Sequence, residues 1–429
     1  MVALLIYGLA ALAILGIYLL RRRRRERVHV AAQQEAERQG LNEPPSLHPI
    51  VSPSRCIGSG GCVVACPEEA LGIVGGKAVL VNAAACIGHG ACEAACPVDA
   101  IQLVFGTEKR GIDIPEVSAQ FESNVPGLFI AGELGGMGLV RKAAEQGRQA
   151  MEAVARRGRG RADCDVVIVG AGPAGISAGL SALEHKLTYR LIEQEDSLGG
   201  TVYHYPRNKL TMTAPVKLAL VGSVRVGEIK KEALLDIWKD IVQRTGLELS
   251  LGERMEDIAQ EGDLFAVRTN RGTHRAASVV LAIGRRGSPR KLGVPGEETP
   301  KVVYRLVDAE QYQGQAVLVV GGGDSALEAA VALSEQPGTS ATLSYRGDAF
   351  SRVKEKNRQA VREAQVSGRL RVEMSSTVER VEPDAVLLQT EAGSVRLPNQ
   401  AVIVCAGGVL PIPLLQKVGV RFATKHGTV

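Results

Sequence analysis

The chain has 429 residues, of which 45% are hydrophobic, so it is long enough for two or three domains with substantial cores. Its formal net charge of +5 is carried by the run Arg21–Arg27, which holds six arginines and one glutamate. The rest of the chain is electrically balanced, so it lacks the basic footprint of a nucleic-acid-binding protein, and nucleic acid is excluded as a partner. Six of the eight cysteines lie between Cys56 and Cys96, and this clustering favours metal ligation over disulfides.

The chain begins with an uncharged, apolar run from Val2 to Leu20. As a helix this run would span about 30 Å, the thickness of a bilayer core. A cleaved signal peptide would carry its basic residues before the apolar run, whereas here they follow it. A buried helix of a soluble domain is the alternative. The sequence predicts a transmembrane helix over residues 1–20 that contacts the membrane through residues 2–20.

The arginines after this run predict the orientation of the chain. The positive-inside rule places them in the cytoplasm, which describes a single-pass protein of the inner (cytoplasmic) membrane. Residues 21–54 are expected to form a basic juxtamembrane segment, a short polar helix to about Gln39 and a linker rich in Pro and Ser.

A duplicated cysteine unit follows the linker. Cys56–Pro67 reads CIGSGGCVVACP, and Cys86–Pro97 reads CIGHGACEAACP. The unit resembles the two-cluster bacterial ferredoxin, whose cysteines run C-x2-C-x2-C-x3-C-P and whose last cysteine binds the other cluster. The resemblance implies an α+β ferredoxin-like domain over residues 55–110 with two iron–sulfur clusters. The implied ligands are Cys56, Cys62 and Cys96 for one cluster and Cys86, Cys92 and Cys66 for the other.

Each copy departs from the ferredoxin pattern at its second cysteine, which is Ser59 in one copy and His89 in the other. One iron of each cluster therefore has no cysteine. It could be bound by His89, less readily by Ser59, or by water, or it could be absent in a [3Fe-4S] instead of a [4Fe-4S] cluster. Neither side chain needs to ligate, since both could simply fill the turn. A structural zinc site is the other alternative, although C-x3-C-P is not a usual zinc spacing.

The segment Ser123–Ala155 reads SNVPGLFIAGELGGMGLVRKAAEQGRQAMEAVA. It resembles the last flavin-binding segment of thioredoxin-reductase-like flavoproteins, usually V-P-G-L-F-A-A-G-D followed by a helix. The resemblance implies a strand over Leu128–Ala131 and flavin contacts from Gly132 and Glu133, with glutamate in place of the usual aspartate.

The position of this segment is unusual, because in that family it ends the chain. Here residues 111–160 come before the first glycine fingerprint. The last stretch, Gly419–Val429, resembles the sequence that normally leads into the segment. A circular permutation would explain both observations, so that residues 111–156 complete the flavin site. The alternative is a remnant of a lost second domain, with the true segment missing.

The stretch Asp165–Leu180 reads DVVIVGAGPAGISAGL, a buried strand, a glycine turn with G-x-G-x-x-G spacing and a helix start. Such a turn binds the pyrophosphate of a dinucleotide at the helix N-terminus. Glu193 ends a strand about 20 residues later, where a carboxylate holds the ribose hydroxyls. The candidate residues of this turn are Gly170, Gly172, Pro173, Ala174 and Gly175.

From Asp163 onward the chain resembles the thioredoxin-reductase-like (pyridine nucleotide-disulfide oxidoreductase) family. Leu198–Thr201 matches its second flavin turn, and Ser278–Gly284 matches its returning strand. The resemblance implies an α/β fold with two Rossmann-like domains, an FAD domain over 161–290 and 401–429 and an NAD(P)H domain over 291–400. The implied further FAD contacts are Gly199, Gly200, Thr201 and Gly284.

A second fingerprint, Gln315–Glu328, reads QAVLVVGGGDSALE. Arg346 and Arg352 stand after its second strand, where an acid would favour NAD. Guanidinium groups suit the 2′-phosphate of NADP, so NADPH is expected, with NADH as the other option and a solvated basic loop as the alternative interpretation. The candidate residues of this turn are Gly321, Gly323, Asp324, Ser325 and Ala326.

Family members that reduce disulfides carry a C-x-x-C dithiol, which is missing at both of the usual places here. The stretch Tyr205–Lys217 is similar to the bacillithiol-disulfide-reductase-like branch, which also lacks it. The resemblances together imply an oxidoreductase that passes electrons from NADPH through FAD to two iron–sulfur clusters and on to a ferredoxin, a quinone or a cytochrome. They imply a homodimer and assign no catalytic acid or base. The alternatives are a low-molecular-weight disulfide reductase and a redox sensor without turnover.

Overall fold

The computed structural model describes residues 2–38, 44, 47–86, 88, 90–108, 111–136, 139–158, 162–205, 210–212, 215–224, 229–285, 287–351 and 353–427. Two of the candidate site residues, His89 and Arg352, lie outside these ranges. Contacts divide the chain into two units. The first holds the chain up to Ile112, residues 347–360 and the end from Lys425; the second holds Asp113–Arg346 and Val361–Thr424.

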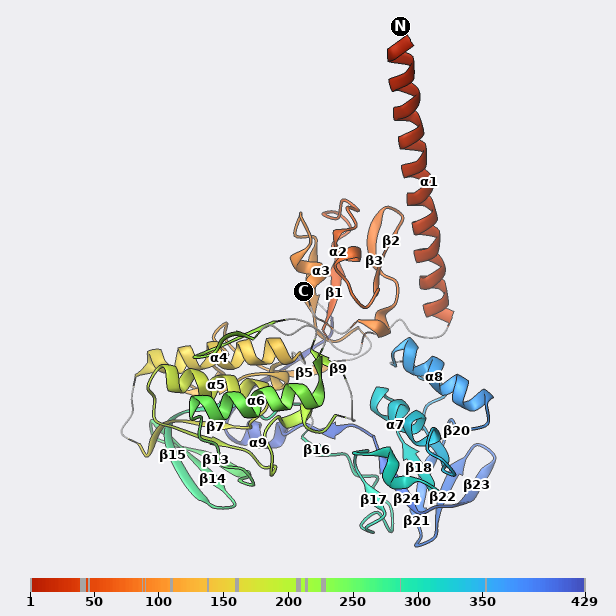
Figure 1. Cartoon of the computed structure of the whole chain (residues 1–429). Coiled ribbons are helices and arrows are strands. Elements are labelled where there is room, and N and C mark those ends of the chain that lie inside the picture. The colour runs from red at the N-terminus through yellow and green to blue at the C-terminus, as the bar shows by residue number, and fades with distance from the viewer. Residues whose placement is uncertain are drawn as a thin grey trace. The chain divides into compact units, whose positions relative to one another are not determined.

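The first unit contains one long helix and a small domain of short strands and helices (Figure 1). Its elements are α1 (Val2–Arg38), β1 (His48–Val51), α2 (Gly61–Val64), β2 (Leu71–Val74), β3 (Lys77–Leu80), the 3₁₀ helix η1 (Ala83–Ala85), α3 (Ala91–Ala94) and β4 (Ile101–Val104).

Helix α1 corrects the prediction of a membrane anchor. The apolar run continues through Arg21–Arg27 in one helix of 37 residues. The C-terminal half of α1 packs on the small domain, where Ile73 N donates to His29 Nδ1 at 3.0 Å and Ala36 is buried against Ala84. In the part of the chain that the structure describes, no helix is both long and apolar enough to span a bilayer. The predicted single-pass location in the inner membrane is therefore wrong.

The small domain repeats its backbone as it repeats its sequence. Strands β1 and β4 pair antiparallel, as do β2 and β3. Gly60 and Gly90, which precede α2 and α3, both have φ of 78°. Because β1 lies inside the segment that was predicted to be a linker up to residue 54, the domain begins earlier in the chain than its first cysteine suggested.

The second unit contains a six-stranded sheet in the order β13-β14-β15-β7-β8, with β6 beside β15. Strands β6, β15, β7 and β8 run parallel, and β13 and β14 form an antiparallel extension. The strands are β6 (Leu128–Ile130), β7 (Cys164–Val169), β8 (Tyr189–Ile192), β13 (Met255–Glu261), β14 (Leu264–Thr269) and β15 (Gly272–Leu281). The helices of this part are η2 (Glu133–Gly135), α4 (Val140–Arg157), α5 (Pro173–Glu184), η3 (Gly200–Val202) and α6 (Lys231–Thr245).

Short strand pairs surround this sheet. They are β5 (Ile112–Pro115) with β26 (Phe422–Lys425), β9 (Leu210–Met212) with β12 (Ile229–Lys230), β10 (Val216–Leu218) with β11 (Gly222–Val224), and β16 (Ser288–Pro289) with β25 (Gly408–Val409). Helix α9 (Ile412–Lys417) precedes β26.

The segment before the first fingerprint belongs to the same sheet as that fingerprint. Leu128 of β6 lies opposite Val279 of β15, and the three residues of β6 are fully buried. Helices α4 and α5 lie side by side (Figure 1). The end of the chain runs next to the start of this segment, since Asn124 binds the backbone of both Gly419 and Arg421, at 2.8 Å in each case.

A second sheet of five parallel strands has the order β17-β24-β18-β19-β20 and is accompanied by an antiparallel sheet, β21-β22-β23. Because β24 pairs with β18, residues 401–404 belong to this sheet and not to the flavin domain, where the sequence placed them. The elements are β17 (Val302–Val303), the 3₁₀ helix η4 (Ala309–Tyr312), β18 (Ala316–Val320), α7 (Asp324–Ser334), β19 (Ser340–Ser344), α8 (Glu355–Val366), β20 (Leu370–Glu373), β21 (Thr377–Val381), β22 (Ala385–Thr390), β23 (Gly393–Pro398) and β24 (Ala401–Val404).

Candidate functional site

The first glycine turn joins β7 to α5. Gly175 lies so close to the preceding strand that a Cβ there would be 1.7 Å from the carbonyl oxygen of Gly170. Only glycine permits this approach of helix to strand. Pro173 opens the helix, where its missing N–H costs nothing because the first N–H groups of a helix have no partner within it. The remaining N–H groups of this first turn can face a phosphate.

Glu193 lies directly after β8, beside this turn. Its side chain is buried, and it accepts hydrogen bonds from Ala171 N at 2.7 Å and from Glu195 N at 3.1 Å. Burial raises the pKa of Glu193, while the hydrogen bonds from the backbone oppose this rise. The carboxylate is thus held in one orientation at the end of the strand.

The other predicted flavin residues converge on the first turn from separate parts of the chain. Gly199 N donates to Ala171 O at 2.9 Å, which places the second turn against the first. A Cβ at Gly284 would lie 3.6 Å from Thr201 Oγ1, and a Cβ at Gly132 would lie 3.2 Å from that of Ala174. Three distant segments therefore meet at one helix N-terminus.

Two residues near this turn were missed by the sequence reasoning. The side-chain carbonyl of Gln146, on α4, accepts a hydrogen bond from Gly132 N at 2.8 Å and so fixes the turn after β6. Burial lowers the pKa of Arg285, and the negative charges of Glu133 and Asp113 oppose that shift. The sequence held a signal for each residue: Gln146 lies on the buried face of an amphipathic helix, and Arg285 directly follows Gly284.

The second glycine turn joins β18 to α7. Gly321 N donates to Ser344 O at 2.9 Å, and Ala326 N donates to Gly323 O at 2.9 Å. Asp324 and Ser325 form the first positions of α7. Arg346 is exposed and stands two residues after β19, next to Tyr345, whose ring packs against Gly322. An exposed guanidinium at this strand end can reach a phosphate on an adenine ribose.

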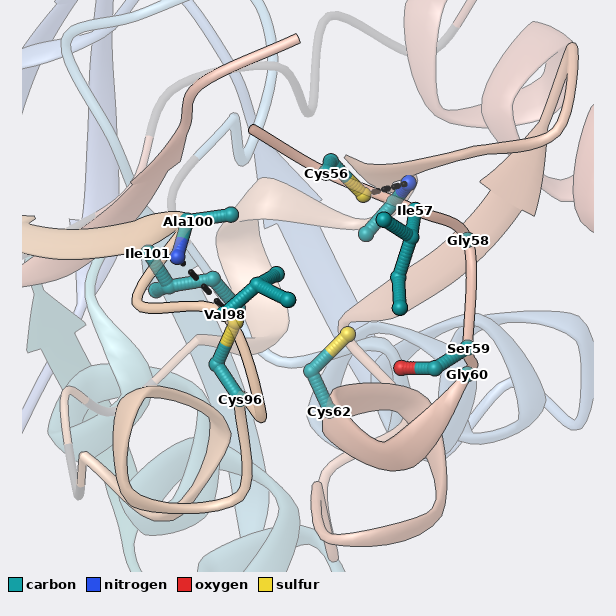
Figure 2. A pocket seen from close by; sticks show the side chains of 11 residues that line it. Cys56, Ile57, Gly58, Ser59, Gly60, Cys62, Cys96, Val98, Ala100 and Ile101 are labelled. Atoms are coloured by element: carbon teal, nitrogen blue, oxygen red, sulfur yellow. Dashed lines mark hydrogen bonds between the residues drawn. The ribbon is translucent and has the colours of Figure 1, made fainter. Parts of the chain in front are cut away.

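The first cysteine site lies between the two copies of the repeat (Figure 2). Cys56, Cys62 and Cys96 line one small cavity together with Ser59. Backbone N–H groups point at two of the sulfurs, from Ala78 to Cys56 Sγ at 3.4 Å and from Ala100 to Cys96 Sγ at 3.2 Å. N–H bonds of this kind stabilise negative charge on thiolate sulfur.

The second cysteine site has the reciprocal composition. Cys66, Cys86 and Cys92 line a second cavity with apolar neighbours that include Leu71 and Leu103. The grouping of the six cysteines into these two sets is the one that the ferredoxin resemblance implied.

The thiols of each set influence one another electrostatically. Burial raises the pKa of Cys92 to about 11, and Cys86 and Cys66 add to this rise. Burial also raises the pKa of Cys62, with Cys56 and Cys96 adding to it. Burial thus disfavours ionisation of these thiols in the absence of a cation, and a bound metal would favour it. Among the described side chains, no set of three His, Cys, Asp or Glu is arranged to hold a metal ion directly.

The two remaining cysteines are separate from both sets. Cys164 is buried, and burial raises its pKa to about 11. Cys405 is partly buried, and its carbonyl oxygen lies against Gly321. A disulfide-exchanging thiol needs a low pKa and access to substrate, and Cys164 has neither.

Two family descriptions match this chain. "Pyridine nucleotide-disulphide oxidoreductase" matches residues 167–428, which is more than half of the chain. "4Fe-4S dicluster domain" matches residues 48–97, and so includes β1.

Individual proteins are similar over the same region. A ferredoxin–NADP reductase of Thermus thermophilus is 34% identical over 257 residues, 57% of this chain and 72% of that reductase. The bacilliredoxin reductase Bdr of Bacillus subtilis is 25% identical over 267 residues, 61% of this chain and 82% of that protein. The structure of the bacillithiol disulfide reductase Bdr from Bacillus cereus has a TM-score of 0.54 and 23% identity, and the match covers 60% of this chain and 82% of that one. This last likeness concerns the fold.

Proposed function

Because this chain belongs to the pyridine nucleotide-disulphide oxidoreductase family and is an FAD-dependent NAD(P)H oxidoreductase, we propose that it passes electrons from NADPH through FAD to two iron–sulfur clusters and on to a ferredoxin, a cytochrome or a quinone. The observation that carries the proposal is the combination of two glycine turns in one chain with two sets of three cysteines, each set around its own cavity.

The first turn fits FAD. No side chain caps the N-terminus of α5, so its first N–H groups can face a pyrophosphate, and the fixed carboxylate of Glu193 stands where a ribose would lie. Gly132 and Glu133 would close the site from β6, which is a proposal supported by the pairing of β6 with β15 in the same chain. The proposed contacts are Gly132, Glu133, Gly170, Gly172, Pro173, Ala174, Gly175, Glu193, Gly199, Gly200, Thr201 and Gly284.

The chemistry supplied by a bound FAD is acceptance of two electrons from a nicotinamide and their release one at a time. The chain's part is to orient the nucleotide. Burial lowers the pKa of Arg285, and the charges of Glu133 and Asp113 oppose this shift. Arg285 would bring a positive charge toward this site, and positive charge favours a reduced, anionic flavin.

The second turn would hold NADPH through Gly321, Gly323, Asp324, Ser325 and Ala326, with Arg346 on the 2′-phosphate. The name of the Thermus thermophilus relative supports NADP(H) as the nucleotide and a ferredoxin-type acceptor. The position of Arg352 lies outside the described residues. We further propose a homodimer, which sedimentation of the purified protein would test.

The placement of β6 also supports a circular permutation. Residues 419–424 run beside residues 113–124, which lead into β6. This placement is expected if the two segments were once continuous in the chain. A remnant of a lost domain would not be expected to occupy the sheet position beside β15.

The test is an anaerobic titration of the purified holoprotein with NADPH, followed by visible absorbance and by electron paramagnetic resonance (EPR). Flavin bleaching followed by the EPR signal of a reduced cluster is expected. The variant Cys92→Ala should bleach normally and lose the signal of one cluster. Bleaching without any cluster reduction in the wild-type protein would overturn the proposal.

Low-molecular-weight disulfide reduction is a second candidate, favoured by the likeness to bacilliredoxin reductase. It predicts NADPH oxidation on addition of bacillithiol disulfide, at a rate that Cys92→Ala leaves unchanged. The absence of bleaching by NADPH would instead favour a redox sensor without turnover.

A further inference from the structure

Ser59 lies at the cavity of the first cysteine site. It occupies the repeat position at which a ferredoxin carries its second cysteine, between Cys56 and Cys62. It lines the same cavity as Cys56, Cys62 and Cys96. Figure 2 shows its hydroxyl directed toward the Cys62 side chain.

The backbone holds Ser59 in this position. It stands between Gly58 and Gly60, which both have positive φ, of 69° and 78°. A Cβ at Gly58 would lie 2.1 Å from the carbonyl oxygen of Gly76, so the loop is packed against the β2–β3 turn. Lys77 Nζ donates to Cys56 O at 2.5 Å and fixes the start of the same loop.

The hydroxyl of Ser59 has no competing partner among the described residues. Within the described part of the chain it makes no hydrogen bond, and the residue is exposed. Its oxygen is therefore available to the cavity, and its proton can leave to solvent.

The described residues of the second cysteine site include no group that matches Ser59. Apart from its three cysteines, the described residues that line the cavity of Cys66, Cys86 and Cys92 are Pro49, Ala70, Leu71, Leu80, Gly88, Gly90 and Leu103, none of which has a side-chain oxygen or nitrogen. His89, at the position equivalent to Ser59, lies outside the described residues.

We propose that Ser59 Oγ is the fourth protein ligand of the cluster held by Cys56, Cys62 and Cys96, and that the two clusters therefore have different ligand sets. Ligation forms one iron–oxygen bond, displaces the water that would otherwise occupy that iron, and releases the hydroxyl proton to solvent, with no change of oxidation state. A bound metal cation makes this loss of the proton favourable. The inference rests on the proposed clusters but not on the direction of electron flow.

The test uses the full chain, reconstituted anaerobically with iron and sulfide, as wild type, Ser59→Ala, Ser59→Cys and the control Ser54→Ala. Ser54 is an exposed serine of the preceding turn and does not line the cavity. The measurements are iron and acid-labile sulfide per chain, and the EPR signal of a three-iron cluster after mild oxidation.

Ser59→Ala is expected to lose about one iron per chain and to increase the three-iron signal several-fold. Ser59→Cys should keep all its iron and lose it to a chelator several-fold more slowly than wild type, and Ser54→Ala should match wild type. The inference would be overturned if Ser59→Ala had the iron content and the EPR signal of wild type. If Ser59→Ala fails to fold, Ser59→Cys decides: iron loss to the chelator at the wild-type rate would overturn the inference. Wild-type protein without acid-labile sulfide would overturn the proposed clusters as well, which separates the two failures.

Discussion

The two glycine turns follow the same strand–turn–helix plan, but their surroundings differ. The first, at Gly170–Gly175, is met by a second turn, by the end of β15 and by the turn after β6. At the second, Cys405 O and the Tyr345 ring lie against Gly321 and Gly322, but no described atom lies within 4 Å of a Cβ placed on Gly323, and Arg346 is exposed. A site enclosed by several segments suits a resident cofactor, whereas an open one suits a nucleotide that binds and leaves in each cycle. The comparison teaches that two copies of one sequence motif can differ in what is packed around them, and the tertiary structure sets that difference.

The largest expected effect is that of Gly175→Ala. Its Cβ would be 1.7 Å from Gly170 O, so the helix must move away from the strand, at a cost of about 3 kcal/mol of stability with loss of bound FAD. The matched control is Gly323→Ala, which meets no such contact and should keep its FAD. Flavin absorbance per chain and urea unfolding measure both. Equal FAD content in the two variants would contradict the contrast between the turns.

The next effect concerns the carboxylate of the first turn. Glu193→Gln removes a charged acceptor from Ala171 N and from the proposed ribose, which should weaken FAD binding roughly ten- to a hundredfold, since such bonds contribute about 1.5–3 kcal/mol. Equilibrium dialysis of FAD measures it. Glu248→Gln, at an exposed residue outside the turn, serves as the control and should bind as wild type.

A smaller effect is expected at the open turn. Arg346→Ala should raise the KM for NADPH about tenfold and leave that for NADH unchanged, because only NADPH carries the 2′-phosphate. Steady-state reduction of ferricyanide measures both. Arg369→Ala, another exposed arginine of the same sheet region, should change neither. A parallel rise in both KM values would show that Arg346 does not read the 2′-phosphate.

The smallest effect is a pH dependence of stability, which should differ in sign between Glu297 and Glu193. Burial opposes ionisation of Glu297, but hydrogen bonds from Leu292 N, Gly293 N and Tyr304 outweigh it and lower its pKa. Its stabilising contribution is therefore present above its ordinary pKa of 4.5 and is lost as pH falls through the lower folded value. At pH 6 the free energy of unfolding of Glu297→Gln, measured with urea, should be about 1 kcal/mol below that of wild type. The two values should approach each other in acid.

Glu193 should behave in the opposite way in protein without FAD. Its pKa is raised by burial, so the favourable contribution is present below 4.5 and is lost as pH rises through the higher folded value. Removing Glu193 should therefore not destabilise the FAD-free protein above that value. A fall in the urea midpoint of FAD-free Glu193→Gln at pH 7 would contradict this.

The sequence predicted the elements whose signals are local. The strand before Gly170, the helix after it and the same plan at Gly321 lie where the glycine spacing placed them, because a turn of this kind is determined by residues a few positions apart. The two cysteine sets were likewise predicted from spacing, through the resemblance to ferredoxins, and they line two separate cavities.

Predictions that depended on distant contacts were less successful. The apolar run Val2–Leu20 was predicted to be a transmembrane helix, whereas it is the first half of α1, whose contact between His29 and Ile73 joins residues 44 positions apart. The roles of Gln146 and Arg285 were missed because their partners, Gly132 and Glu133, lie in the segment before the first fingerprint, and the sequence did not show how that segment packs.

The sequence by itself determined the two glycine turns, because short-range sterics are written in neighbouring residues, and the resemblance to ferredoxins supplied the grouping of the six thiols. Only the tertiary structure decided that β6 joins β15, that three segments converge on the first turn while Gly323 of the second has no described neighbour within 4 Å, and that Ser59 lines the cavity of Cys56, Cys62 and Cys96. These features depend on packing between residues that are far apart in sequence. Local pattern carries no record of such packing: the sequence named the strand over Leu128–Ala131 and Ser59 as candidates, and the fold decided what each of them contacts.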